Sequence, residues 1–214
     1  MSKNNETHKK QNNQNKIRFS DVFNINEIQQ LQDLFSESNN VSSIITTVDG
    51  IPITRPSSFS DLCESVILTT ENGIKNCNRN RQLILQNITD ELHVYSCLHC
   101  GLFDVGVPII VGGEHIANWI IGQIRDEKIE EEKIQQTASE LNIDYKTFLN
   151  AYKNVPVMSL ENFKKVSLML QAFVYQISTN AYNNYVLKQK LQEIEAANKM
   201  VDFSKKQVNS ILIT

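Results

Sequence analysis

The sequence has few of the residues that form tight turns. Only seven glycines and four prolines occur among its 214 residues, too few for an all-β sandwich, whose many strands need turns at short intervals. Hydrophobic residues make up 41% and charged residues 21%, which is ordinary for a domain with an apolar core and unlike a disordered chain. The scarcity of turn residues therefore favours the α+β class, with long helices around a modest sheet.

The sequence also lacks an excess of positive charge and any long apolar run. Lys and Arg number 21 against 24 Asp and Glu, a net charge of -3, so no global positive field would attract nucleic acid. No stretch approaches the roughly 18 consecutive apolar residues that a membrane span needs, and the N-terminus has no apolar signal segment. We therefore expect a cytoplasmic protein with neither a nucleic-acid nor a membrane partner.

Known catalytic signatures are missing as well. The sequence has no nucleophile-elbow glycine pattern, no phosphate-binding glycine loop and no helical His-Glu-x-x-His. Cys97 or Cys100 with His99 would be a conceivable Cys–His pair, but adjacent strand residues face opposite ways. We expect no enzymatic activity.

The first 16 residues predict a disordered tail. They contain five Asn, four Lys and two Gln, and Met1 is their only large apolar residue. Such a segment cannot bury enough apolar surface to offset the entropy lost on ordering.

The next part of the chain alternates between strand and helix patterns. Asp49-Gly50 separates the β-branched run 42–48 from 51–53 and predicts a hairpin, because both central turn residues favour positive φ. Helices are expected at 61–68 and 71–88. Three further strands are expected at 92–97, 101–111 and 115–124, the last two joined by a Gly112-Gly113 turn. The pattern predicts five strands with helices covering one face.

The C-terminal part is helical, with a long helix beginning after Pro156 and Ser159 as its cap. From Leu187 the helix has residues at alternating spacings of four and three, which is a heptad seam: Leu187, Leu191, Ile194, Asn198, Val201, Lys205, Val208 and Leu212. Asn198 at a core position favours a parallel, in-register dimer. The alternatives are a coiled-coil homodimer and a helix folded back on its own domain.

Several separated motifs resemble the sensory domain of the PocR family. Residues 97–119 read CLHCGLFDVGVPIIVGGEHIANW and are followed by Ile121-Gly122-Gln123. Upstream, Ser43-Ile44-Ile45-Thr46, the segment 59–63 and Cys77 match earlier family motifs in the right order. The resemblance spans roughly Asn26 to Ala181, so we expect a sensory domain over 24–181. The heptad spacing predicts that a coiled-coil-like signalling helix follows over 182–214.

The resemblance implies a PAS-like module, in which a five-stranded antiparallel sheet cups a pocket for a small hydrocarbon derivative such as a diol. Such modules usually stand ahead of a histidine kinase, a cyclase-type domain or a DNA-binding output. The chain ends where an effector would begin, so it is either a sensor that works with a partner kinase or regulator, or a truncated protein.

The four cysteines leave three interpretations open. Cys63, Cys77, Cys97 and Cys100 would supply the soft ligands that tetrahedral zinc or an iron–sulfur cluster needs, although only one C-x-x-C is present. They would equally suit a redox-active or ligand-contacting thiol, or semi-buried cysteines that line a pocket. The resemblance favours the pocket, because its matched positions include Cys63, Cys77 and Cys97. No other cofactor is expected.

The remaining predicted ligand-binding residues are His99, Asp104, Trp119 and Gln123. Asp104 interrupts an apolar strand, where a carboxylate needs a partner to offset its desolvation. Trp119 and Gln123 lie four residues apart on one strand, which predicts that they share a face. An aromatic wall with an amide and a carboxylate suits a small polar-ended molecule, while the alternative places Trp119 in the core.

Three hypotheses for function follow. The first is a small-molecule sensor that transmits occupancy through its C-terminal helices. The second is a cysteine-based metal or redox sensor. The third is an interaction or scaffold protein that uses its helical end.

Overall fold

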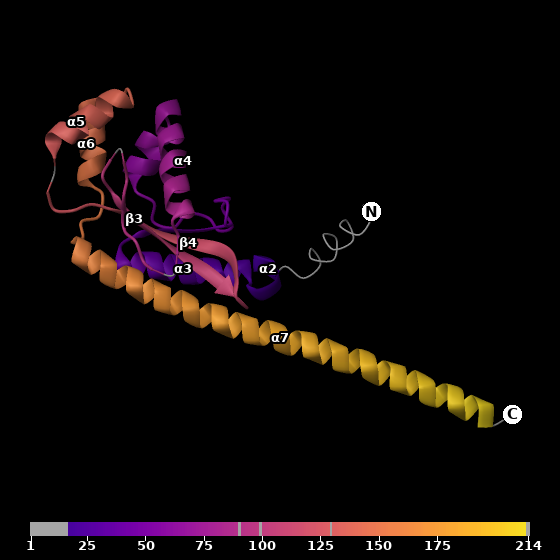
Figure 1. The fold of residues 1–214 in the computed structure, drawn as a ribbon. Helices are drawn as coiled ribbons and strands as arrows, with labels where there is room; N and C mark the ends of the chain where they lie inside the picture. The colour runs from indigo at the N-terminus through magenta and orange to yellow at the C-terminus, as the bar shows by residue number, and fades with distance from the viewer. Residues whose placement is uncertain (1–16, 90, 99, 129, 213–214) are drawn as a thin grey trace, which may run out of the picture.

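The computed structural model of the chain describes residues 17–212 except 90, 99 and 129, and the side chains as far as 207. The fold is α+β, with one antiparallel sheet, helices on both of its faces and a long C-terminal helix that projects from the domain (Figure 1). The predicted disordered tail, residues 1–16, lies outside the described residues.

The sheet has four strands in the order β1-β4-β3-β2. Their bounds are Ser42–Thr46 for β1, Tyr95–Ser96 for β2, Phe103–Val111 for β3 and Glu114–Ile124 for β4. Every neighbouring pair is antiparallel. Gly112 and Gly113 join β3 to β4 with φ of 61° and 84°, the left-handed region that favours glycine, which confirms the predicted diglycine hairpin.

The predicted fifth strand, over 51–53, is not part of the sheet. The chain does turn after β1, with the Gly50 N–H donating to the Thr47 carbonyl at 3.0 Å. Past the turn, however, only isolated bridges join Thr46 to Pro52 and Ser43 to Ser57. Proline has no N–H to donate to a ladder, so the two prolines at 52 and 56 prevent continuous pairing here.

One face of the sheet is covered by α2 (Phe19–Val22), α3 (Ile25–Asn39) and the first part of α7 (Leu160–Leu212). The core on this side is the larger of two and contains Trp119, Phe163 and Leu170, all with 0% of their surface exposed. It fixes α7 firmly against the sheet.

The other face carries η1 (Leu62–Ile67) and α4 (Glu71–Gln86). Helices α5 (Glu131–Glu140) and α6 (Tyr145–Lys153) pack against each other, and α6 packs against η1, in the second core. The segment predicted as an α-helix at 61–68 contains a π-helix, in which the Leu68 N–H donates to the carbonyl of Cys63, five residues earlier. Such wide turns occur often at functional sites. The Thr70 side chain caps α4 by accepting from the Gly73 N–H at 3.0 Å.

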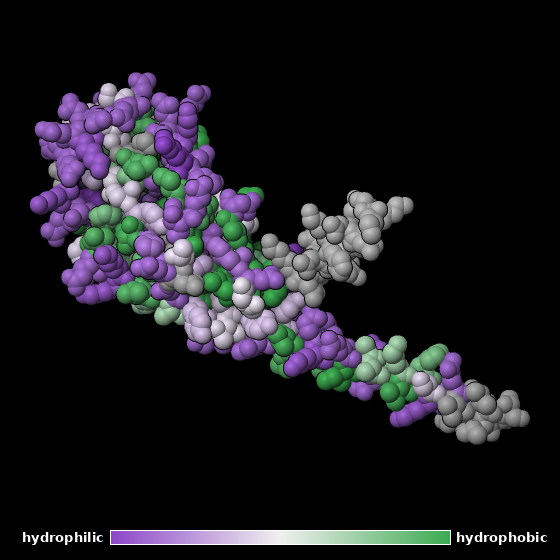
Figure 2. All heavy atoms as spheres, in the orientation of Figure 1, coloured by the Kyte–Doolittle hydropathy of each residue, from purple (hydrophilic) through white to green (hydrophobic). Residues whose placement is uncertain are grey.

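The C-terminal helix α7 is continuous, and the Ser159 hydroxyl accepts from the Asn162 N–H at 3.3 Å near its start. Beyond Ala181 it leaves the domain (Figures 1 and 2), and every side chain from 187 to 207 is exposed. Of the two alternatives for this helix, the structure therefore contradicts the one in which it folds back on its own domain. In the described part of the chain, no helix combines the length and the apolar character needed to cross a membrane.

Candidate functional site

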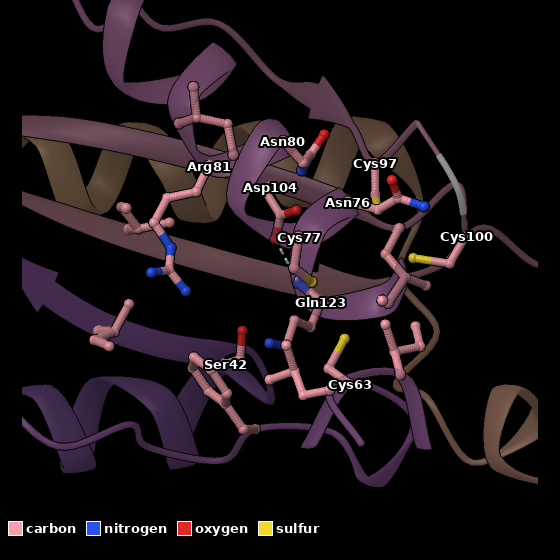
Figure 3. A pocket seen from close by; sticks show the side chains of 18 of the residues that line it. Ser42, Cys63, Asn76, Cys77, Asn80, Arg81, Cys97, Cys100, Asp104 and Gln123 are labelled. Carbon is pink, nitrogen blue, oxygen red and sulfur yellow. Dashed lines mark hydrogen bonds between the residues drawn. The ribbon is translucent and has the colours of Figure 1, made fainter. Parts of the chain in front are cut away.

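A cavity of about 110 Å³ lies between the sheet and the pair η1 and α4 (Figure 3). Its apolar wall includes Ile44 and Ile120 from the sheet and Leu102 from the segment before β3. All four cysteines reach it. Its polar lining residues are Ser42, Asn76, Asn80, Arg81, Asp104 and Gln123. An apolar hollow with a few convergent polar groups has the character of a small-molecule site.

A β-bulge brings Gln123 to this cavity. Asp104 pairs with Gly122 while Phe103 pairs with Ile124, so Gln123 has no partner across the sheet, and its φ is 54°. Its N–H donates to Asp104 Oδ1 at 3.1 Å. A side chain at Gly122 would overlap Asp104 Oδ1 and the Phe103 carbonyl, so the close approach of the two strands requires glycine there.

The Gln123 side chain ties the sheet to η1. Its Oε1 accepts from both the N–H and the hydroxyl of Ser60, at 2.7 and 3.0 Å. The Ser60 hydroxyl in turn accepts from the Cys63 N–H at 3.3 Å. These three bonds hold one wall of the cavity at a fixed distance from the other.

The bulge also overturns the expectation that Trp119 and Gln123 share a face. Trp119 points to the opposite side of the sheet, where its Nε1–H donates to Ser43 Oγ at 2.7 Å and its ring packs edge-on against Phe35 and Phe173. The extra residue at 123 breaks the alternation on which the expectation rested. Trp119 is thus a core residue and lies outside the cavity lining.

Two buried polar side chains face the cavity without protein partners. Asn80 is 7% exposed and Ser42 is 5% exposed, and both line the cavity. No hydrogen bond joins either side chain to another residue that the structure describes. Among the described side chains, the polar atoms that are shut off from solvent without a partner are Arg125 Nε and Ser178 Oγ. The polar atoms of Ser42 and Asn80 therefore open onto the cavity, where a small molecule can form hydrogen bonds with them.

Asp104 is the ionisable group most affected by the cavity. Burial raises the pKa of Asp104 to about 7, and negative charge at Cys97 contributes in the same direction. The hydrogen bond from the Gln123 N–H offsets part of this rise. Near neutral pH the carboxyl group can therefore serve either as an acceptor or, when protonated, as a donor.

Cys63, Cys77 and Cys100 are held in the thiol form. Burial raises the pKa of Cys63 to about 12 and the pKa of Cys77 to about 11. The pKa of Cys100 is also raised, first by a hydrogen bond with Cys97 and then by burial. Thiols are poorer nucleophiles and metal ligands than thiolates. Within the described ranges, no three His, Cys, Asp or Glu side chains are grouped so that they could hold a metal ion.

The structure brings most of the predicted site together. The cavity is lined by Cys63, Cys77, Cys97, Cys100, Asp104 and Gln123, whereas His99 lies outside the described residues. Sequence reasoning missed Ser42, Asn76, Asn80 and Arg81. One signal was available, because Gly73, Cys77, Asn80 and Ile84 follow one another at spacings of four, three and four on a single helical face.

Comparison with known proteins agrees with this geometry. The family model described as "Sensory domain found in PocR" matches residues 21–182. A curated relative, "Regulatory protein PocR" of Salmonella typhimurium (strain LT2), is 21% identical over 172 residues. That match covers 79% of this chain and 56% of the relative, so the chain spans little more than half of the relative's length. With the family model matching most of its length, the chain belongs to the PocR sensory-domain family.

Proposed function

We propose that the cavity binds a small, neutral, polar-ended molecule and that the domain is a non-catalytic sensor for it. The observation that carries the proposal is the pair of largely buried polar side chains, Ser42 and Asn80, which line the cavity and form no hydrogen bond with another described residue. A ligand hydroxyl can both donate and accept, and would satisfy such groups. The name of the curated relative, a regulatory protein, supports a role in signalling.

The dimensions of the cavity limit the ligand. An apolar cavity of about 150 Å³ holds benzene, so a cavity of about 110 Å³ suits a molecule of roughly four to five heavy atoms. Ile44, Leu102 and Ile120 would contact its hydrocarbon part, and Asp104 would accept from a hydroxyl. A short diol or alcohol meets both requirements.

The signal would pass through the sheet. Asp104 and Ile120 face the cavity, while their neighbours Val105 and Ile121 belong to the core beneath α7. A ligand can shift α7 only by binding one arrangement of these strands more tightly than another. The output would be an attached effector or a partner kinase or regulator.

Thermal unfolding in the presence of ethanol, ethylene glycol, 1,2-propanediol, 1,3-propanediol and glycerol tests the proposal. A ligand raises the melting temperature with the logarithm of its excess over Kd, and we expect at least one diol to do so. Asn80→Leu should abolish this shift. Asn78→Leu makes the same chemical change on the exposed face of α4 and should retain it. A flat response of the unaltered protein to all five compounds would refute the proposal.

A second function, a redox sensor or a metal sensor, is suggested by the four thiols that line one cavity, and binding of a metal would require the thiols to move closer together, since the described side chains are not grouped to hold one. Zinc or an iron–sulfur cluster would have to displace the thiol protons that burial favours. Metal analysis and the visible absorption spectrum of anaerobically purified protein separate the two functions. Stoichiometric metal, together with unfolding by a chelator and no response to diols, would replace the first proposal by the second.

A further inference from the structure

One face of α7 has an unbroken heptad spacing across the edge of the domain. Inside the domain, this heptad face forms one side of the surface that packs on the sheet: Phe163 and Leu170 are buried, and Val166, Phe173 and Ile177 are partly buried. The same alternation of three and four continues through the exposed Asn180 and Asn184 to Leu187. The seam beyond the domain is therefore in heptad register with one side of the surface that seats α7 on its own sheet.

Past Ala181 this stripe has no sheet beneath it. Leu187, Leu191, Ile194 and Val201 are 67%, 55%, 57% and 50% exposed. An apolar stripe at heptad spacing on a projecting helix is stable in water when a second helix covers it. Figure 2 shows hydrophobic residues, in green, along the projecting part of α7.

We propose that a second copy of this chain covers the stripe, as a parallel, in-register coiled coil that begins just beyond Ala181. A pair of complementary charges beside the seam supports this occupant. With Leu187, Ile194 and Val201 at d positions and Leu191 and Asn198 at a positions, Lys190 is at g and Glu195 is at the following e. In a parallel dimer these two positions face each other across the interface, so each dimer contains two Lys190–Glu195 pairs.

The polar residues at the core positions of the seam favour a coiled coil of two helices. Asn198 and Lys205 both occupy a positions, and polar residues there specify register and oligomeric state at a cost in stability. In a parallel dimer the two Asn198 side chains lie opposite each other and can hydrogen-bond. Helix α7 would thus contact the sensory sheet along its first half and the second copy along its other half.

A second exposed apolar surface on α7, away from the seam, provides the control variant. Met200 and Phe203 are 75% and 63% exposed, but they occupy c and f positions, away from the seam. In sedimentation velocity over a dilution series, the full chain should have twice the mass of one chain. Ile194→Glu should convert it to a monomer, while Phe203→Glu should leave it dimeric. Circular dichroism would confirm that both variants are folded.

Charge exchange tests the orientation. Lys190→Glu and Glu195→Lys each place like charges opposite each other twice per dimer, and each should raise the dimer Kd about three- to tenfold. The double exchange should restore the Kd. In an antiparallel dimer g positions face g positions and e positions face e positions, so the double exchange would not restore the dimer Kd.

Several outcomes would overturn the inference. The first is that the unaltered chain is a monomer. The second is that Phe203→Glu dissociates the dimer and Ile194→Glu does not. The third is that the double charge exchange does not restore the dimer Kd. None of them bears on ligand binding, because the interface lies wholly outside the cavity. The inference and the proposed function can therefore fail separately.

Discussion

Replacing Asp104 with asparagine should change how the stability of this domain depends on pH. The folded protein raises the pKa of Asp104 from 3.8 to about 7, so the native state holds the proton more tightly than the unfolded chain does. Stability from this group is fully present below pH 3.8 and is lost as pH rises through about 7. Asparagine resembles the protonated form, keeps the acceptor for the Gln123 N–H and does not titrate.

The magnitude follows from the two pKa values. Each pH unit between them changes the free energy of unfolding by about 1.4 kcal/mol, so ionised Asp104 costs at most about 4 kcal/mol above pH 7. The stability of Asp104→Asn relative to the unaltered protein should therefore increase from pH 4 to pH 7 and then level off.

Urea unfolding at pH 5, 6, 7 and 8, under reducing conditions, measures this difference. Asp202→Asn, on the exposed projecting part of α7, is the matched control and should follow the unaltered protein at every pH. If Asp104→Asn also ran parallel to the unaltered protein over this range, the argument that the cavity disfavours the carboxylate would be refuted.

Three further predictions concern the bulge, the thiols and the helix. Gly122→Ala should lower the free energy of unfolding in urea by about 1–3 kcal/mol, because the added methyl group would overlap Asp104 and Phe103. Gly113→Asn, where the added side chain meets open space, should lower the free energy of unfolding less. Equal losses of stability in the two variants would count against the bulge. Cys77 is the only one of the four thiols that is not fully buried, so a disulfide reagent followed by peptide mapping should label it first; earlier labelling of Cys63 would contradict the cavity. Asn198→Leu should stabilise the coiled coil and allow it to associate into more than two helices. An unchanged oligomeric state in sedimentation velocity would argue against the proposed coiled coil.

The parts of the fold set by local sequence were predictable. Gly112-Gly113 identified the β3–β4 hairpin, and Ser159 after Pro156 placed the start of α7. The five-strand expectation was wrong because the strand pattern at 51–53 took no account of Pro52. The convergence of Cys63, Cys77 and Cys97 followed from the family resemblance, since nothing in their spacing alone brings them together.

The missed features depend on contacts between distant residues. The bulge at Gln123 exists because Asp104, 19 residues earlier, pairs with Gly122, and no local pattern at 119–123 reveals it. Asn80 sits in a helix with other asparagines, such as Asn72 and Asn78, that are exposed. Only the docking of α4 on the sheet distinguishes the buried amide from its exposed neighbours.

The two faces of β4 can be altered separately by substitution. Ile120 lines the cavity on one side, while Trp119 and Ile121 belong to the core layer that supports α7 on the other. Substitutions at the cavity-facing positions of β4 would change which molecule is recognised. Substitutions at its core-facing positions would change how tightly α7 packs on the sheet. A lineage could thus acquire a new stimulus without rebuilding its connection to the output.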